Sequence, residues 1–248
     1  MQAIRSKIQL LGGEEIAYED PAEYDQRNKI NETEWYIYSN WHPYLISKMR
    51  EIGKGKLVVD LGCGTCEFTQ HLDGSKAVIG LDYSSNMLNH ASNKVKELEA
   101  LLLRGDACKI PIKSNISDVI YGIGLIPYVN LEPFLMECKR ILGNNGKIML
   151  VFANKWNLYN LQYSLIRKIF RRKNYDRREY SYKEVKVALE KAGFIVLDMK
   201  CFGMVTYCPM PLQKIVKYIW RFMDKIYSPF QSALPLGISI MVLAEKRP

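Results

Sequence analysis

Residues 58–66 read Val-Val-Asp-Leu-Gly-Cys-Gly-Thr-Cys, and residues 78–82 read Val-Ile-Gly-Leu-Asp. The pattern predicts a buried strand, a glycine turn, a helix, and a second buried strand that ends in an acid. Gly62 and Gly64 permit a tight turn that brings backbone N–H groups and a helix N-terminus towards a ligand. In a doubly wound sheet, Asp82 would lie beside a ribose and accept hydrogen bonds from both hydroxyls. We therefore predict a nucleoside site at this turn.

Two classes of cofactor use such a turn. Dinucleotide enzymes carry G-x-G-x-x-G, in which the third glycine lets the helix pack closely on the strand. Glu67 occupies that third position here. A carboxylate is an unfavourable neighbour for a pyrophosphate, whereas a ligand with a sulfonium and an ammonium tolerates both Asp60 and Glu67. The charges favour S-adenosylmethionine over NAD.

Short apolar runs alternate with helical patterns along most of the chain. This alternation predicts βαβ units, and hence an α/β fold with a doubly wound parallel sheet that helices cover on both faces. An N-terminal helix is expected over residues 31–52, with Pro43 dividing it into two pieces. The expected strands are 57–61, 77–81, 101–104, 118–121, 147–153, 194–200 and 238–245, and the expected helices are 66–72, 84–100, 131–142, 181–192 and 212–227.

Five motifs in order resemble those of class I S-adenosylmethionine-dependent methyltransferases, in particular the type 11, quinone-biosynthesis-like group. The resemblance covers residues 56–153. It implies a Rossmann-like, mostly parallel sheet of seven strands, with the seventh antiparallel beside the sixth. It also implies S-adenosyl-L-methionine as the cofactor and a small molecule as the methyl acceptor. The motifs that carry it are residues 58–65, 81–88, 104–107, 118–129 and 140–146.

The same resemblance assigns cofactor contacts residue by residue. Three of them have an ordinary structural alternative, because Met87 could be core, Asp106 could cap a local turn and Asp82 could cap the end of its strand. The family relation places the methionine part of the cofactor against Asp60, Gly62, Cys63 and Gly64, the ribose against Asp82, the adenine faces against Tyr83 and Met87, the adenine edge against Asp106 and Ala107, and the sulfonium near Ile123.

The expected reaction is an in-line displacement from an activated donor, so the main task of an enzyme is to align the reacting atoms. A base is needed only if the acceptor loses a proton before attack. Pro127-Tyr128 replaces the His-His pair that the family often carries after the fourth strand. The remaining catalytic candidates are Tyr128, His42 and Tyr24, whereas His71 and His90 are expected to be structural or exposed.

Three additions to the sheet are expected to form a helical cap over the cofactor. Residues 1–55 are predicted as an N-terminal helical cap, and residues 56–248 as the methyltransferase domain with cap insertions at 154–180 and 202–237. The helix at 212–227 is amphipathic, with apolar residues at helical spacing and basic residues elsewhere. Its apolar stripe could pack on the domain, form the wall of a hydrophobic or amphiphilic acceptor site, or lie on a membrane surface.

The distribution of charged residues indicates which binding partners the chain could have. The formal net charge is +9, and basic residues crowd positions 167–178. Such a patch is either a solvated helix end or a contact for phosphates, an acidic substrate or an anionic membrane surface. A nucleic-acid methyltransferase is the second hypothesis, but the [D/N/S]-P-P-[Y/F/W] motif typical of base-amino methylation is replaced by Tyr-Gly-Ile-Gly at 121–124. A non-catalytic, regulatory protein that binds S-adenosylmethionine is the third hypothesis.

The sequence also predicts the compartment of the protein and the role of its cysteines. No apolar run approaches the ~18–20 residues that span a bilayer. The N-terminus has no signal-peptide pattern, so we expect a cytoplasmic protein. Cys63 and Cys66 form a C-x-x-C pair, but no second pair or suitably spaced histidine accompanies them, so we predict packed thiols and no metal. The acceptor, the atom methylated and the oligomeric state stay open.

Overall fold

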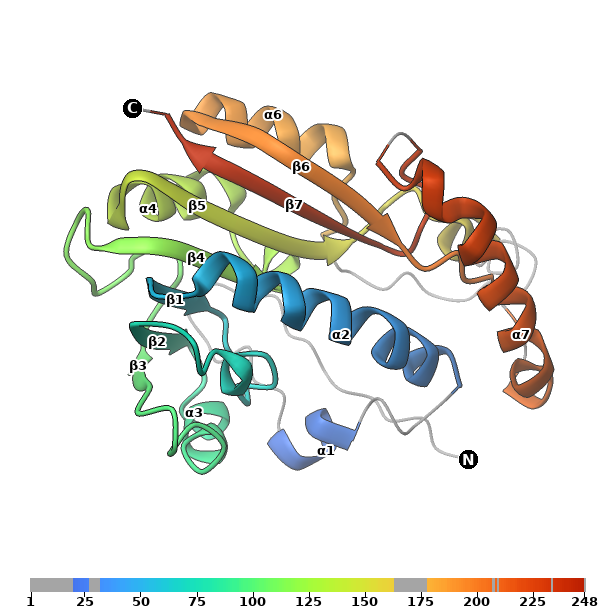
Figure 1. The fold of residues 1–248 in the computed structure, drawn as a ribbon, viewed down its shortest axis with the longest axis horizontal. Helices are drawn as coiled ribbons and strands as arrows, with labels where there is room; N and C mark the ends of the chain where they lie inside the picture. Colours follow the sequence, from blue (N-terminus) through green and yellow to red (C-terminus); the bar gives the residue numbers. More distant parts are fainter. Residues whose placement is uncertain are drawn as a thin grey trace.

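The computed structural model describes residues 20–26, 32–162, 178–206, 208, 210–232 and 234–247. Its seven-stranded sheet has the order β3-β2-β1-β4-β5-β7-β6 (Figure 1). β1 to β5 pair in parallel, and β7 runs antiparallel between β5 and β6. The predicted doubly wound, mostly parallel α/β fold is confirmed. The strands are β1 (Leu57–Leu61), β2 (Ala77–Asp82), β3 (Leu101–Arg104), β4 (Ser117–Ile123), β5 (Leu142–Ala153), β6 (Phe194–Phe202) and β7 (Ser239–Lys246).

Helices cover both faces of this sheet (Figure 1). Successive strand residues point to opposite faces, so Ile120 packs with α4 and α6, whereas Val119 and Tyr121 pack with α2. The Tyr121 hydroxyl also donates to the carbonyl of Met49 in α2, at 2.6 Å. The helices are α1 (Pro21–Gln26), α2 (Glu32–Gly53), α3 (Ser85–Ala91), α4 (Leu131–Ile141), α6 (Tyr182–Ala192) and α7 (Met210–Tyr227), with 3-10 turns η2 (Thr69–His71), η3 (Ile126–Tyr128) and η4 (Ser228–Phe230).

Local sequence explains the ends of α6. Ser181 and Glu184 form a capping box at its start, which satisfies two backbone N–H groups reciprocally. Gly193 ends it in the left-handed region, at φ +90°. That backbone conformation is one that residues other than glycine rarely adopt. The helix therefore begins and ends where the sequence predicts.

Two predicted helices are shorter in the structure. Residues 66–72 form only the turn η2, because Cys66 takes φ +59°, which no right-handed helix allows. The helix expected at 84–100 ends at Ala91. The Ser92 hydroxyl donates to the carbonyl of Asn89, a local bond that competes with helix propagation, and Glu99 takes φ +52°.

Two further expectations at element boundaries are wrong. Pro43 does not divide α2, which is a single helix. Proline removes the donor to the carbonyl four residues earlier, but Pro43 and Ser39 are both exposed, so water can serve that carbonyl. β5 begins at Leu142 and not at Lys147, because residues 142–146 continue the strand through a register shift against β4.

None of the described helices has both the length and the apolarity to cross a membrane.

Three additions meet at the edge where the parallel strands end, which we term the carboxyl rim. β6 runs parallel to β5, since both pair antiparallel with β7, so α7 follows β6 from this rim. Figure 1 shows α7 projecting there beside the N-terminal half of α2. One buried group, the rim cluster, joins the additions. It consists of Tyr36, Val205, Cys208 and Trp220, with Tyr159 and Val216 packed against it.

Candidate cofactor site

The glycine turn after β1 leaves open space at the carboxyl rim. Gly62 and Gly64 have φ values of +69° and +53°. The Gly62 N–H donates to the carbonyl of Leu81 at 2.7 Å, which ties the turn to β2. A Cβ at Gly62 would lie 2.8 Å from Leu125 Cδ1, whereas a Cβ at Gly64 would meet nothing within 4 Å. A ligand can therefore approach the backbone closely at Gly64.

Asp82, the last residue of β2, is held next to this turn. Its Oδ2 accepts the Gly64 N–H at 2.8 Å, and its Oδ1 accepts the Ser84 N–H at 2.9 Å. Burial raises the pKa of the Asp82 carboxyl, and these N–H bonds oppose the rise. An ionised carboxylate has about four acceptor sites, so both oxygens can accept further hydrogen bonds. The side chain is thus fixed between the glycine turn and the first turn of α3.

Asp60 lies beneath the turn and not on its surface. Its side chain is 3% exposed, and its Oδ2 accepts the Thr69 hydroxyl at 2.6 Å. Burial, together with the nearby charge of Asp82, raises the pKa of Asp60 to about 7. The ionisation of Asp60 is therefore sensitive to any cation that binds close to the turn.

Helix α1 is attached to the same turn through Asp25. The Asp25 carboxylate accepts the Thr65 hydroxyl at 2.5 Å and contacts His90 Nε2 at 2.8 Å and Lys94 Nζ at 2.5 Å. Hydrogen bonds from these groups outweigh burial and lower the pKa of Asp25. Tyr24, its neighbour, is half-buried. The sequence contains no motif that predicts the Asp25–Thr65 contact.

The remaining predicted cofactor residues lie just after β2, in α3, and around the ends of β3 and β4. Tyr83 is 40% exposed, whereas Met87 is buried in α3. Asp106 is exposed and its Oδ1 accepts the Cys108 N–H at 2.7 Å, so it does cap a local turn. Ala107 is buried in the core. Ile123, the last residue of β4, is half-buried.

Cys63 and Cys66 are packed side chains. Both are buried and belong to a cluster with Leu88, Ala91 and Val95 of the α3 region. A hydrogen bond with Cys66 and burial raise the pKa of the Cys63 thiol well above its ordinary value. A buried thiol with a raised pKa, such as that of Cys63, is a poor nucleophile and a poor metal ligand.

The three catalytic candidates lie on three different elements. Tyr128 ends η3, just beyond β4, and is half-buried. His42 lies on α2, with its ring centroid 4.6 Å from that of Phe68. Tyr24 lies on α1. The elements that carry them all lie near the carboxyl ends of β1 and β4, which is where a substrate would enter.

Trp41 is a further residue of interest that sequence reasoning missed. Among the described residues, its Nε1 is a buried donor with no hydrogen-bond partner. Its ring lies 4.4 Å from that of Phe202, the last residue of β6, which places it at the carboxyl rim. An unsatisfied buried donor costs about 1–3 kcal/mol. A ligand oxygen would satisfy it.

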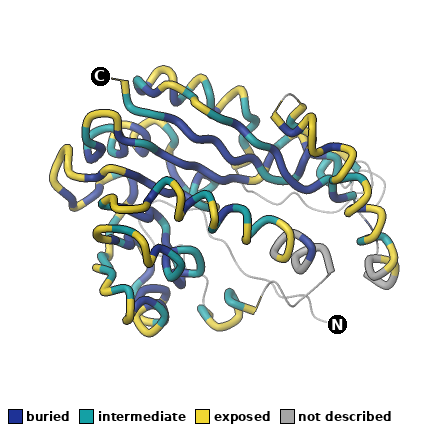
Figure 2. The backbone as a smooth tube through the Cα atoms, viewed as in Figure 1, coloured by how far each residue is buried: buried dark blue, intermediate teal, exposed yellow. Residues whose placement is uncertain are grey.

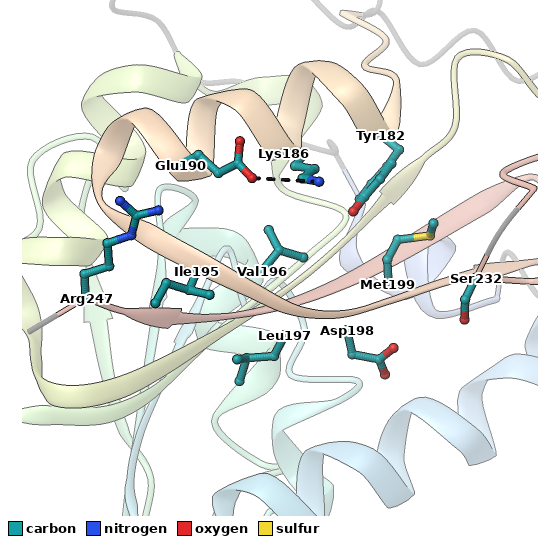
Figure 3. Close-up of a pocket in the computed structure, with 10 residues that line it drawn as sticks. All are labelled: Tyr182, Lys186, Glu190, Ile195, Val196, Leu197, Asp198, Met199, Ser232 and Arg247. Atoms are coloured by element: carbon teal, nitrogen blue, oxygen red, sulfur yellow. Dashed lines mark ion pairs between the residues drawn. The ribbon is translucent and has the colours of Figure 1, made fainter.

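The structure also has a cavity of about 390 Å³ that is separate from this site. Figure 3 shows it between α6 and β6, where Lys186 and Glu190 form an ion pair of 3.8 Å. β6 is four strands from β1, or about 19 Å at the usual strand spacing. None of the predicted site residues lines this cavity. Its lining residues are Tyr182, Lys186, Glu190, Ile195, Val196, Leu197, Asp198, Met199, Ser232 and Arg247.

A family model described as a methyltransferase domain matches residues 59–150, which run from within β1, through the glycine turn, into β5. This part of the chain is therefore similar to a methyltransferase domain. The match agrees with the class I S-adenosylmethionine-dependent methyltransferases that the motifs resemble, and it supports S-adenosylmethionine as the cofactor. The residues fit this cofactor: Gly64 leaves open space for a ligand, Asp82 can accept ribose hydroxyls, and the two acids near the turn suit a cation.

Several other methyltransferases resemble the chain in sequence or in fold. A demethylmenaquinone methyltransferase from Staphylococcus epidermidis is 32% identical over 159 residues, which are 59% of this chain and 65% of that protein. The match thus spans less than two thirds of that relative. A methyltransferase from Thermotoga maritima has a TM-score of 0.62 at 18% identity, covering 91% of this chain and 95% of its own. The geranyl diphosphate C-methyltransferase of Streptomyces coelicolor has a TM-score of 0.58 at 13% identity, covering 83% and 77%.

Proposed function

We propose that the chain is an enzyme that transfers the methyl group of S-adenosylmethionine to a small, hydrophobic or amphiphilic acceptor. The position of Asp82 carries this proposal. Its carboxylate is held by the Gly64 and Ser84 N–H groups at the end of β2, beside open space. That is the arrangement a ribose diol requires in a doubly wound sheet.

The cofactor contacts that the sequence suggests are part of the proposal. Asp82 would hold the ribose, and the backbone of the glycine turn would hold the methionine part. Tyr83 is exposed enough to cover one face of the adenine, whereas Met87 and Ala107 would act from within the core. Asp106 and Ile123 would flank the adenine edge and the sulfonium. Asp60 would act through its charge, from beneath the turn.

The bound cofactor supplies an activated methyl group and leaves as a neutral sulfide. The chain's own residues therefore need mainly to orient the acceptor and exclude water, and alignment alone can contribute about 7–11 kcal/mol. Tyr128, His42 and Tyr24 are the residues from which a base would come if the acceptor must lose a proton. Their elements converge on the carboxyl rim, which supports these roles.

Aromatic side chains at the rim support an apolar acceptor. Trp41 and Tyr44 pack against Phe202, with ring centroids 4.4 and 5.4 Å apart. Two of the similar proteins are named for demethylmenaquinone and for geranyl diphosphate, both of which carry isoprenoid chains, whereas the Thermotoga maritima structure is named as a possible histamine N-methyltransferase. We propose an acceptor of similar amphiphilic character. The sequence also suggests contact with an anionic membrane surface. That contact is a separate proposal, which rests on α7.

Incubation with methyl-labelled S-adenosylmethionine and cell extract tests this function. We expect label in a product that partitions into organic solvent, and none when Asp82→Ala protein is used. Labelled RNA or DNA would favour the nucleic-acid hypothesis instead. Cofactor binding without any labelled product, in aqueous or organic fractions, would favour the regulatory hypothesis.

Cofactor affinity should depend on pH through Asp60. Since its pKa is about 7 and the cofactor carries a sulfonium, the ionised form binds better, and affinity should rise up to about tenfold from pH 6 to pH 8. Asp60→Asn should flatten this profile in isothermal titration. S-adenosylhomocysteine, whose sulfur is neutral, should show a weaker dependence. An equally steep profile in the Asn variant would assign the titration to another group.

The same pKa has a consequence for stability without cofactor. The folded-state pKa of Asp60, about 7, is above the ordinary value of 3.8, so the neutral carboxyl favours the folded state at low pH. That contribution is complete below about pH 4 and is lost as the pH rises through 7. Urea unfolding of wild-type and Asp60→Asn protein at pH 5 and pH 8 should show a larger pH difference in the wild type.

Trp41→Phe should separate acceptor binding from stability. The substitution keeps an aromatic ring at the rim and removes a donor that has no partner among the described residues, which offsets the smaller volume of phenylalanine, so the melting temperature should change little. If the donor meets an acceptor oxygen, KM for the acceptor should rise about tenfold while the cofactor Kd stays constant. A lower melting temperature with unchanged KM would indicate a structural role.

A further inference from the structure

Helix α7 exposes its apolar residues to solvent. Leu212, Ile215, Ile219, Phe222 and Ile226 are each between 52% and 67% exposed. Their spacing of three and four residues places them in one row along the helix, about 21 Å long. Figure 2 shows α7 as a largely exposed helix at the end of the molecule. Large apolar patches of this kind usually mark an interaction surface.

The opposite side of α7 attaches it to the protein. Trp220 is fully buried, its ring lies 5.6 Å from that of Tyr36, and its Nε1 donates to the Thr206 hydroxyl at 3.0 Å. At about 100° per residue, Tyr218 lies across the helix from Trp220 and is 64% exposed. The apolar row is thus turned away from the rim cluster, and it does not face the proposed acceptor site.

The exposed side of α7 also carries a basic row. Arg221 and Lys225, both exposed, follow at helical spacing on the other side of Tyr218 from the apolar row. The only acid of the helix, Asp224, is directed inward, because its Oδ1 accepts the Met204 N–H and its Oδ2 accepts the Tyr36 hydroxyl. The surface formed by the apolar row, Tyr218 and the basic row, which we term the α7 outer face, therefore has only positive charge.

We propose that the α7 outer face docks on the surface of an anionic lipid bilayer. Apolar side chains would enter the headgroup boundary, and Arg221 and Lys225 would meet lipid phosphates, which is the two-part pattern of interfacial helices. Charge decides against a second copy of the chain. Each copy has a formal net charge of +9, and two outer faces placed together would oppose cation to cation. An anionic bilayer is complementary to both rows.

Docking would also deliver the acceptor, and this step alone rests on the proposed function. Because α7 follows β6 from the carboxyl rim, a docked bilayer would present an amphiphilic acceptor near that rim. The binding of vesicles itself needs neither cofactor nor acceptor. It can therefore be tested separately from catalysis.

The experiment is co-sedimentation of the full chain with phosphatidylcholine vesicles, with and without phosphatidylglycerol. We expect binding only with phosphatidylglycerol, and weaker binding at high salt. The combined variant Ile215→Gln, Ile219→Gln and Phe222→Gln should bind at least tenfold more weakly, and so should Arg221→Gln with Lys225→Gln. The matched control is Leu101→Gln, Met136→Gln and Leu197→Gln, whose parent side chains are 48–55% exposed elsewhere on the surface and should leave binding unchanged.

Unchanged melting temperatures would show that the α7 variants are folded, since the substituted side chains are exposed. Asp82→Ala should bind vesicles normally, so loss of catalysis and loss of docking are distinguishable. No binding, or equal binding to neutral vesicles, would overturn the proposal. A wild-type dimer in light scattering that the apolar-row variant abolishes would assign the face to a second copy instead.

Discussion

Asp82→Ala is expected to weaken S-adenosylmethionine binding at least tenfold in isothermal titration. The substitution removes both carboxylate oxygens that would accept the ribose hydroxyls. It also leaves the Gly64 and Ser84 N–H groups without the carboxylate to which they donate, so the glycine turn loses its hydrogen-bonded link to the start of α3. Hydrogen bonds to a charged group contribute about 1.5–3 kcal/mol each, and about 1.4 kcal/mol already corresponds to tenfold.

Asp118→Ala is the matched control for this loss. Asp118 Oδ2 accepts the Leu57 N–H at 2.8 Å, so it is also a carboxylate that accepts a backbone N–H. It lies at the opposite end of β1 and β4, away from the carboxyl rim. We expect unchanged cofactor affinity in Asp118→Ala and an intermediate loss in Asp82→Asn. Wild-type affinity in Asp82→Ala would remove the ribose assignment.

Trp220→Ala should lower the free energy of unfolding by about 3–5 kcal/mol, the usual range for truncating a fully buried large aromatic side chain. It removes the contact with Tyr36 and the bond to Thr206, through which α7 is held to α2 and to residues 202–206. Because the rim cluster is separate from the glycine turn, acceptor turnover should fall by more than tenfold while the cofactor Kd changes less than threefold. Urea unfolding, titration and turnover measure these three quantities.

Trp156→Ala provides the comparison for that variant. Trp156 is 67% exposed, so its truncation should change the unfolding free energy by no more than about 0.5 kcal/mol. An equal loss of cofactor affinity and acceptor turnover in Trp220→Ala would mean that α7 only stabilises the fold. In that case the proposed division between the cofactor site and the cap would be wrong.

The sheet could be predicted from the sequence because its determinants are local. Buried parallel strands are continuous apolar runs, and caps such as Ser181 and Gly193 mark helix ends. The two helices that are predicted too long end where they do because of local backbone conformations and hydrogen bonds, which hydrophobic periodicity does not reveal. Cys66 takes a positive φ, which is uncommon for residues other than glycine, at the position where the first of these helices is expected to begin. The helix expected at 84–100 ends at Ala91, next to the bond from the Ser92 hydroxyl to the Asn89 carbonyl.

The candidate site could be predicted only in part, for a similar reason. Asp82 follows a motif with a fixed position in the fold, so sequence alone suggests it. Asp25 and Trp41 reach the site from elements that are distant in sequence, and no spacing rule connects either residue to Thr65 or Phe202. The apolar row of α7 is visible as a pattern, but a pattern does not report what covers it. The structure shows that it is exposed.

The most direct test of this account is a crystal structure of the chain with S-adenosylhomocysteine. We predict the nucleoside at the carboxyl ends of β1 and β2, with both ribose hydroxyls within hydrogen-bond distance of Asp82 and the amino-acid part against the backbone at Gly64. A nucleoside bound elsewhere, or a site that takes up a dinucleotide while S-adenosylhomocysteine fails to bind, would contradict it.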